Sequence, residues 1–309
     1  MYKYILKRLL FLIPVFLGVS FVVFLMLYIT PGDPARMALG QQASQEAVEN
    51  FREAEGLNDP FIVQYGRYLY KAVFKGDLGT SYSTKRPVVQ EILNVFPTTL
   101  KLTLFSMFIA ILLGIPFGII SAIKQYSVLD TIVMFIALIG ISMPVFWLGL
   151  LLILGFSVHL GWFPPSGFYS LRHMVLPSVA LSAQAVAIIT RMTRSSMLEV
   201  IRQDYIRTVR AKGQKESIVI GFHALKNALI PIITVVGVQF GYLLGGAILT
   251  EVIFSINGVG RLMVEAITTR NYPVVQGGVL FVALAFSLVN LLVDILYAYV
   301  DPRIKAQYK

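Results

Sequence analysis

Long apolar stretches are the feature that most constrains what this sequence can fold into. An α-helix needs about 20 mostly apolar residues to cross a hydrocarbon layer of roughly 30 Å. Six stretches qualify, the fourth being shorter and more polar: residues 9–29, 100–123, 131–158, 175–189, 229–253 and 277–300. The sequence therefore predicts an all-α integral membrane protein with six transmembrane helices.

The composition supports a membrane protein over a soluble one. Hydrophobic residues make up 57% of the chain and charged residues only 14%, and the mean hydropathy is +0.75. Soluble domains average about 25% charged residues. A soluble fold would have difficulty burying this apolar excess, whereas a bilayer removes the need.

The first apolar stretch follows a basic start (Lys3, Lys7 and Arg8), as a cleaved signal peptide would. Its apolar run is longer than the usual 7–15 residues, however, and no A-x-A cleavage site follows it. We therefore expect a retained first span.

The net charge of +10 arises from 26 Lys and Arg against 16 Asp and Glu. Short cytoplasmic loops of membrane proteins carry an excess of Lys and Arg, so the charge pattern predicts orientation and requires no nucleic acid. Both termini are expected in the cytoplasm, because that orientation leaves only Arg172, Arg261 and Arg270 in short outer loops. The cytoplasmic side then holds Lys3, Lys7, Arg8, Lys124, the basic residues of 191–226, Arg303, Lys305 and Lys309.

These boundaries divide the chain into a first segment and span (1–30), a small extracytoplasmic region (31–98) and a five-helix core (99–309). The outer region is expected to hold helices at 45–55 and 61–74, separated by turn residues. A short helix around residues 262–267 should end before Pro273, because a residue preceding proline resists helical angles. Aromatic residues of the second outer helix are expected to pack: Phe61, Tyr65, Tyr68 and Tyr70.

The chain lacks the residue sets of an enzyme. It has no cysteine, and its three histidines are scattered without metal-ligand spacing. It also has no G-x-x-x-x-G-K-[ST] loop to hold phosphates, so the chain is not expected to hydrolyse ATP itself. One hypothesis for a six-span chain of this kind is an ion-coupled carrier, which would use embedded ionisable groups. The candidates are Glu251 and Asp294, and both lie near span ends.

The most informative segment is a cytoplasmic loop, residues 191–227. Asp204 could cap a helix over 205–212, and Gly213 could stop it. A second helix from about Lys215 carries an apolar stripe. Two short helices with a glycine between them suit docking on a protein at the membrane surface better than a plain connector does.

Residues 204–213 of this loop resemble the EAA loop of ABC importer permeases. The match is to the B-type permease of the dipeptide and oligopeptide family, which includes glutathione and nickel systems. Gly213 keeps the loop glycine, whereas Arg207 stands where the general pattern has glutamate. Peptide-type permeases share this variant, together with the run from His223 to Pro231. Further family-like motifs lie at 31–34, 76–81, 144–149, 258–261 and 271–277.

The resemblance implies a type I ABC importer permease fold in a bacterial or archaeal cytoplasmic membrane. It implies pairing with a second, distinct permease, two cytoplasmic ATPases that carry ATP and Mg²⁺, and an extracytoplasmic substrate-binding protein; the chain itself binds no cofactor. The cargo could be a dipeptide, an oligopeptide, glutathione or a nickel chelate. The residues expected to couple to an ATPase are Tyr205, Arg207, Thr208, Val209, Arg210, Ala211 and Gly213.

Residues that could line a transport pathway are harder to assign. Small and polar side chains on the third to fifth spans either line a wet path or join helices, where Ser and Gln are common. Glycines of the fifth span are expected to permit close helix approach. The polar candidates are Ser142, Ser178, Ser182, Gln184 and Gln239, and the glycines are Gly237, Gly241, Gly245 and Gly246.

Overall fold

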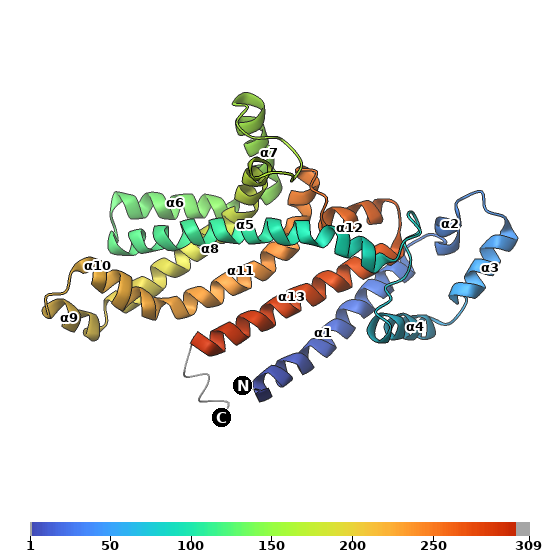
Figure 1. Cartoon of the computed structure of the whole chain (residues 1–309), viewed down its shortest axis with the longest axis horizontal. Helices are drawn as coiled ribbons and strands as arrows, with labels where there is room; N and C mark the ends of the chain where they lie inside the picture. Colours follow the sequence, from blue (N-terminus) through green and yellow to red (C-terminus); the bar gives the residue numbers. More distant parts are fainter. Residues whose placement is uncertain (1, 301–309) are drawn as a thin grey trace.

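A computed structural model describes residues 2–300 of the chain (Figure 1). Long helices run side by side as a slanted bundle, with α2–α4 at one end and α9–α10 at the other. The elements are α1 (Tyr2–Ile29), α2 (Pro34–Leu39), α3 (Gln45–Glu55), α4 (Phe61–Phe74), α5 (Val88–Ile123), α6 (Val128–Ser142), α7 (Val145–Leu152), the π-helix η1 (Ile153–His159), α8 (Leu171–Ile201), α9 (Asp204–Ala211), α10 (Glu216–Ile218), the π-helix η2 (Val219–Ala224), α11 (Leu225–Ile253), α12 (Val259–Thr268) and α13 (Tyr272–Val300).

Within residues 2–300, five helices are long and apolar enough to cross a membrane, and a sixth span results if α6 is counted with α7 and η1. The six expected stretches all fall on these elements. The expected C-terminal charges Arg303, Lys305 and Lys309 lie outside the described residues, as does the side chain of Asp294.

The third span differs from the prediction of one helix over 131–158. The chain bends by 107° between α6 and the α7–η1 pair. Met143 leaves the helical region at φ −78° and ψ 127° because it precedes Pro144, whose ring clashes with a helical neighbour. Residues 145–159 consequently run in a different direction from α6 (Figure 1), while Leu152, Ile153 and Phe156 still pack against the core.

Three other helices, α5, α8 and α11, are longer than the expected spans. α8 extends to Ile201 rather than ending near residue 189, and α11 begins at Leu225. The first and last residues of the expected loop 191–227 therefore belong to α8 and α11, and only residues 202–224 connect these two helices. α5 similarly begins at Val88 and not at residue 100, so the expected division at 98/99 falls inside a helix.

The core of the bundle lies where α5, α8 and α11 pack together. Two glycines allow α5 to approach α8: a Cβ at Gly114 would lie 2.8 Å from Ile189 Cγ2, and one at Gly118 would lie 2.4 Å from Thr193 Cβ. Small residues at such contacts permit the close backbone approach that helices in membranes use. The sequence-based reasoning did not single out these two positions.

The expected glycine contacts of the fifth span are half correct. A Cβ at Gly237 would lie 2.0 Å from Val293 Cγ1, and one at Gly241 would lie 2.7 Å from the Phe286 ring, so both glycines permit close packing on α13. Gly245 has nothing within 4 Å and Gly246 only a leucine methyl group at 3.7 Å. The prediction of close approach was wrong for these two, because they lie on the outward face of α11.

The outer region matches the expected helices at 45–55 and 61–74. Ser44 caps α3 by accepting from the backbone N–H of Ala47, and Gly56 ends it at φ +65°. Aromatic packing holds α4 on α1, since the Phe21 and Phe24 rings each lie 5.5 Å from Tyr65. The expected packing role is thereby confirmed for Phe61, Tyr65 and Tyr68, whereas Tyr70 is 55% exposed.

Candidate functional site

The candidate site is α9, which lies beyond the long helices at the end of the molecule opposite α2–α4 (Figure 1). Its inner face is apolar. Ile206 is completely buried, and Val209 packs against the same cluster, which α8, η2 and α11 complete. Burying this face fixes α9 firmly against the ends of the long helices.

The turn after α9 is set by a glycine and an ion pair. Gly213 has φ +74°, a left-handed conformation that only glycine adopts at little cost. Arg210 then reaches across the turn and donates from Nε and Nη2 to Glu216, at 3.1 and 2.6 Å. The loop is thus closed on itself by a bidentate contact.

The beginning of α9 differs from the prediction. Gln203 is the N-cap residue, without a side-chain capping bond, and Asp204 is the first helical residue. The Asp204 side chain is 98% exposed and lies 3.6 Å from Arg207. The negative charge in the first turn still complements the helix dipole.

The expected coupling residues divide between two faces. Arg207 is 75% exposed, and Thr208 and Ala211 lie on the same open surface. Tyr205 is 41% exposed, and its hydroxyl accepts from Asn227 Nδ2 at 2.9 Å. The outer face of α9 therefore offers Tyr205, Arg207, Thr208 and Ala211, whereas Val209 faces the chain's own core and Arg210 is bound to Glu216.

A buried charge near the same end was missed by the sequence-based reasoning. The Asp130 carboxylate accepts from Arg194 Nε and Nη2 at 2.8 and 2.7 Å, from the Tyr126 N–H at 2.9 Å and from the Ser121 hydroxyl. The contact joins α5, α6 and α8. An aspartate and an arginine at the ends of apolar segments were the available signal.

Glu251 has a structural role at the other end of the bundle. Its carboxylate is fully buried and accepts from Thr99 Oγ1 at 2.6 Å and from the Arg261 N–H at 3.1 Å. Thr99 Oγ1 accepts in turn from the Val259 N–H. Glu251 thus accepts a hydrogen bond from a backbone N–H in the first turn of α12 and connects this helix to α5 and α11. This is a structural role for an embedded acid.

Asn271 links two motifs that the resemblance singled out. Its amide donates to Ser81 Oγ at 2.9 Å and accepts from the Tyr82 N–H at 3.0 Å. The contact spans 190 residues and fastens the loop after α4 to the start of α13. The sequence motifs at 76–81 and 271–277 therefore form one junction.

The polar pathway candidates do not form one surface. Ser178, Ser182 and Gln239 are buried between helices, and Ser182 bonds only to the Val179 carbonyl of its own helix. Ser142 and Gln184 are exposed. Among the described residues, none of the buried three has a side-chain hydrogen bond to another helix, and the exposed two remain available to a pathway.

A bundle of apolar spans with a short docked helix beyond one end is the architecture of a multi-pass membrane protein. Among similar proteins of known role, the dipeptide transport system permease protein DppB of Alkalihalophilus pseudofirmus is 50% identical, covering 99% of this chain and all of that one. The glutathione transport system permease protein GsiC of Pectobacterium atrosepticum is 47% identical over 99% of both chains.

This chain belongs to the family of binding-protein-dependent transport system inner membrane components. The family model matches residues 114–306, and that of the family's N-terminal part matches residues 1–103. A chain of the MetNI methionine ABC transporter has the same fold, with a TM-score of 0.58 at 20% identity over 69% of this chain and 97% of that one. The protein is therefore an ABC importer permease, a translocation component of a complex with ATPase and substrate-binding partners.

Proposed function

We propose that this protein is the permease for dipeptides or oligopeptides in an ABC importer of a bacterial or archaeal cytoplasmic membrane. The full-length similarity to a dipeptide permease supports this cargo. The proposed complex contains a second homologous permease, two cytoplasmic ATP-binding subunits and an extracytoplasmic substrate-binding protein. Both termini and α9 face the cytoplasm in this arrangement.

The exposed face of α9 carries the mechanistic part of the proposal. Residues Tyr205, Arg207, Thr208 and Ala211 would enter a groove of one ATPase, while buried Ile206 transmits its movement to the ends of α8 and α11. ATP and Mg²⁺ would bind only on the ATPase subunits. Closure of the two ATPases would then move the spans as rigid bodies, a form of two-state switching.

Charge reversal at Arg207 tests the coupling role. In the complete complex reconstituted in liposomes, Arg207→Glu should lower ATP-dependent uptake of L-alanyl-L-alanine at least about tenfold, because a charged hydrogen bond contributes roughly 1.5–3 kcal/mol. The loss should accompany reduced recovery of the ATPases in a detergent pull-down.

Arg172→Glu is the matched control, because Arg172 is exposed at the opposite end of α8. It should leave uptake and assembly unchanged. Gly213→Pro should uncouple as Arg207→Glu does, since proline cannot adopt φ +74°. Normal uptake in both α9-loop variants would remove the coupling role from this segment.

Glutathione is the second candidate cargo, because the glutathione permease GsiC is nearly as similar to this chain as DppB is. Competition in the same liposomes separates the two. Unlabelled dipeptide should displace labelled L-alanyl-L-alanine, and glutathione should not. Displacement by glutathione and not by unlabelled dipeptide would instead assign glutathione as the cargo.

A further inference from the structure

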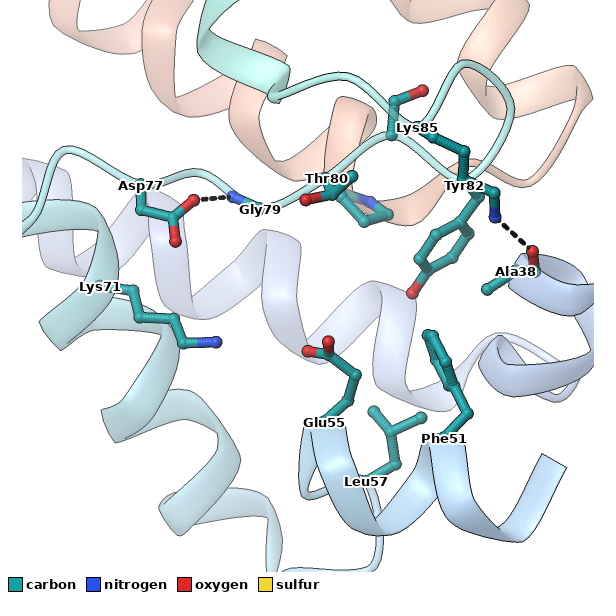
Figure 2. A pocket seen from close by; sticks show the side chains of 12 residues that line it. Ala38, Phe51, Glu55, Leu57, Lys71, Asp77, Gly79, Thr80, Tyr82 and Lys85 are labelled. Carbon is teal, nitrogen blue, oxygen red and sulfur yellow. Dashed lines mark hydrogen bonds between the residues drawn. The ribbon is translucent and has the colours of Figure 1, made fainter. Parts of the chain in front are cut away.

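A cavity of about 360 Å³ opens in the outer region, between α3, α4 and the loop that follows α4 (Figure 2). It shares residues Glu55, Lys71, Asp77 and Tyr82 with an adjoining cavity of about 150 Å³. Small-molecule sites occupy roughly 300–1,000 Å³, so the larger cavity has the size of a small ligand. It lies at the opposite end of the bundle from α9.

Both signs of charge point into this cavity. Figure 2 shows the Glu55 carboxylate rising from α3, the Lys71 ammonium extending from α4 and the Tyr82 ring descending from the loop. Within the described residues, neither Glu55 nor Lys71 has a side-chain hydrogen bond or an ion pair. Two neighbours are instead occupied, since Lys85 donates to the Ala38 carbonyl and Asp77 accepts from the Gly79 N–H.

Two tyrosine hydroxyls add unused hydrogen-bonding capacity. Burial, with Glu55 nearby, raises the pKa of Tyr82 to about 12, so its hydroxyl remains a donor at neutral pH. Tyr68 lines the adjoining cavity, and its buried hydroxyl has no partner among the described residues. Buried polar groups in native proteins are nearly always paired, which suggests that these groups receive a ligand or water.

We infer that this cavity binds a short zwitterionic peptide, with its α-ammonium on Glu55 and its α-carboxylate on Lys71. An anion alone would meet the two carboxylates Glu55 and Asp77, and a cation alone would meet Lys71 and Lys85. A ligand that carries both charges satisfies the lining. Phe51 and Leu57 supply the apolar wall for its side chains.

This outer peptide site goes beyond the proposed function. The class of its ligand rests on the proposed peptide cargo, but its test does not involve the α9 contact, because binding can be measured on the full chain without its partners. A failure of binding would leave the transport role intact, and a failure of transport would leave this site intact.

The test uses the full chain in lipid nanodiscs and three probes measured by calorimetry. Wild type should bind L-alanyl-L-alanine, and should bind N-acetyl-L-alanyl-L-alanine and L-alanyl-L-alaninamide at least about tenfold more weakly, since each lacks one charged hydrogen bond. Absence of L-alanyl-L-alanine binding, or equal binding of all three probes, would overturn the inference.

Two variants assign each charge to its partner. Glu55→Gln should remove the preference for the free over the acetylated amine, and Lys71→Met should remove the preference for the acid over the amide. Glu53→Gln and Lys75→Met are the matched controls, because both residues are exposed and neither lines the cavity. Preferences that survive in Glu55→Gln and Lys71→Met would overturn the assignment. It would also be overturned if these two variants weaken docking of the substrate-binding protein while the wild-type chain binds no peptide.

Discussion

At the scale of single residues, Asp130 shows how this fold accommodates a charge where water is scarce. Its side chain is 6% exposed, and the Arg194 side chain is 23% exposed. Its hydrogen-bond donors come from α5, from α8 and from the turn between α5 and α6, so both carboxylate oxygens are satisfied. Removing one partner of such a pair costs more than the pair contributes, because the other charge remains buried and unpaired.

We therefore expect Arg194→Met to lower the free energy of unfolding by roughly 3 kcal/mol. Thermal unfolding in detergent, followed by the intrinsic fluorescence of tryptophan, measures the loss. Adding Asp130→Asn should recover part of it, because no charge is then left buried. Arg202→Met is the control, since among the described residues Arg202 has a single exposed side-chain hydrogen bond, to Gln125; an equal loss there would contradict the argument.

The residues of the α9 turn were predictable, whereas the buried partners were not. Gly213 could be read from local chain geometry, because a glycine after a short helix indicates a left-handed stop. Asp130 pairs with an arginine 64 positions away, and Glu251 with a threonine 152 positions away. Sequence spacing within one helix carries no information about such contacts between helices.

At the scale of elements, helix bounds were predicted best where local signals end the helix. α3 and α4 match their expected ranges because Ser44 and Gly56 mark the ends of α3, and the following segment begins at Pro60. The bend at Met143 was missed because apolar composition continues through Pro144. The extension of α8 to Ile201 was missed because polar residues are frequent in it, although Thr193 is buried and Arg194 pairs with Asp130 of α6.

Packing between elements explains the glycine motif at 258–261. A Cβ at Gly260 would lie 2.4 Å from Ile248 Cα of α11, and the obstacle is backbone. We expect Gly260→Ala to lower the free energy of unfolding by about 1–3 kcal/mol, the range for overpacked sites. Gly245→Ala is the control within α11, because nothing lies within 4 Å of that position; it should be neutral or slightly stabilising. Equal melting temperatures for the two variants would contradict the close-packing argument.

At the scale of the whole molecule, the two ends of the bundle have different chemistry. The α9 end is held by the Asp130–Arg194 pair and carries a docked helix with an exposed arginine. The opposite end is held by the Glu251 and Asn271 contacts and carries the charged cavity. Rigid junctions at both ends suit a chain whose spans move as units.

The orientation of these ends can be measured directly because the chain contains no cysteine, so any introduced thiol is the only one. Gln42→Cys lies in the exposed turn between α2 and α3, and Ala211→Cys lies on the exposed side of α9. Since Lys and Arg of short loops concentrate on the cytoplasmic side, we expect a membrane-impermeant maleimide to label Gln42→Cys in intact cells and Ala211→Cys only after permeabilisation. Labelling of both after permeabilisation is the control for thiol reactivity. The reverse pattern in intact cells would place α9 outside, where no cytoplasmic ATPase could reach it, and the coupling proposal would fail with the orientation.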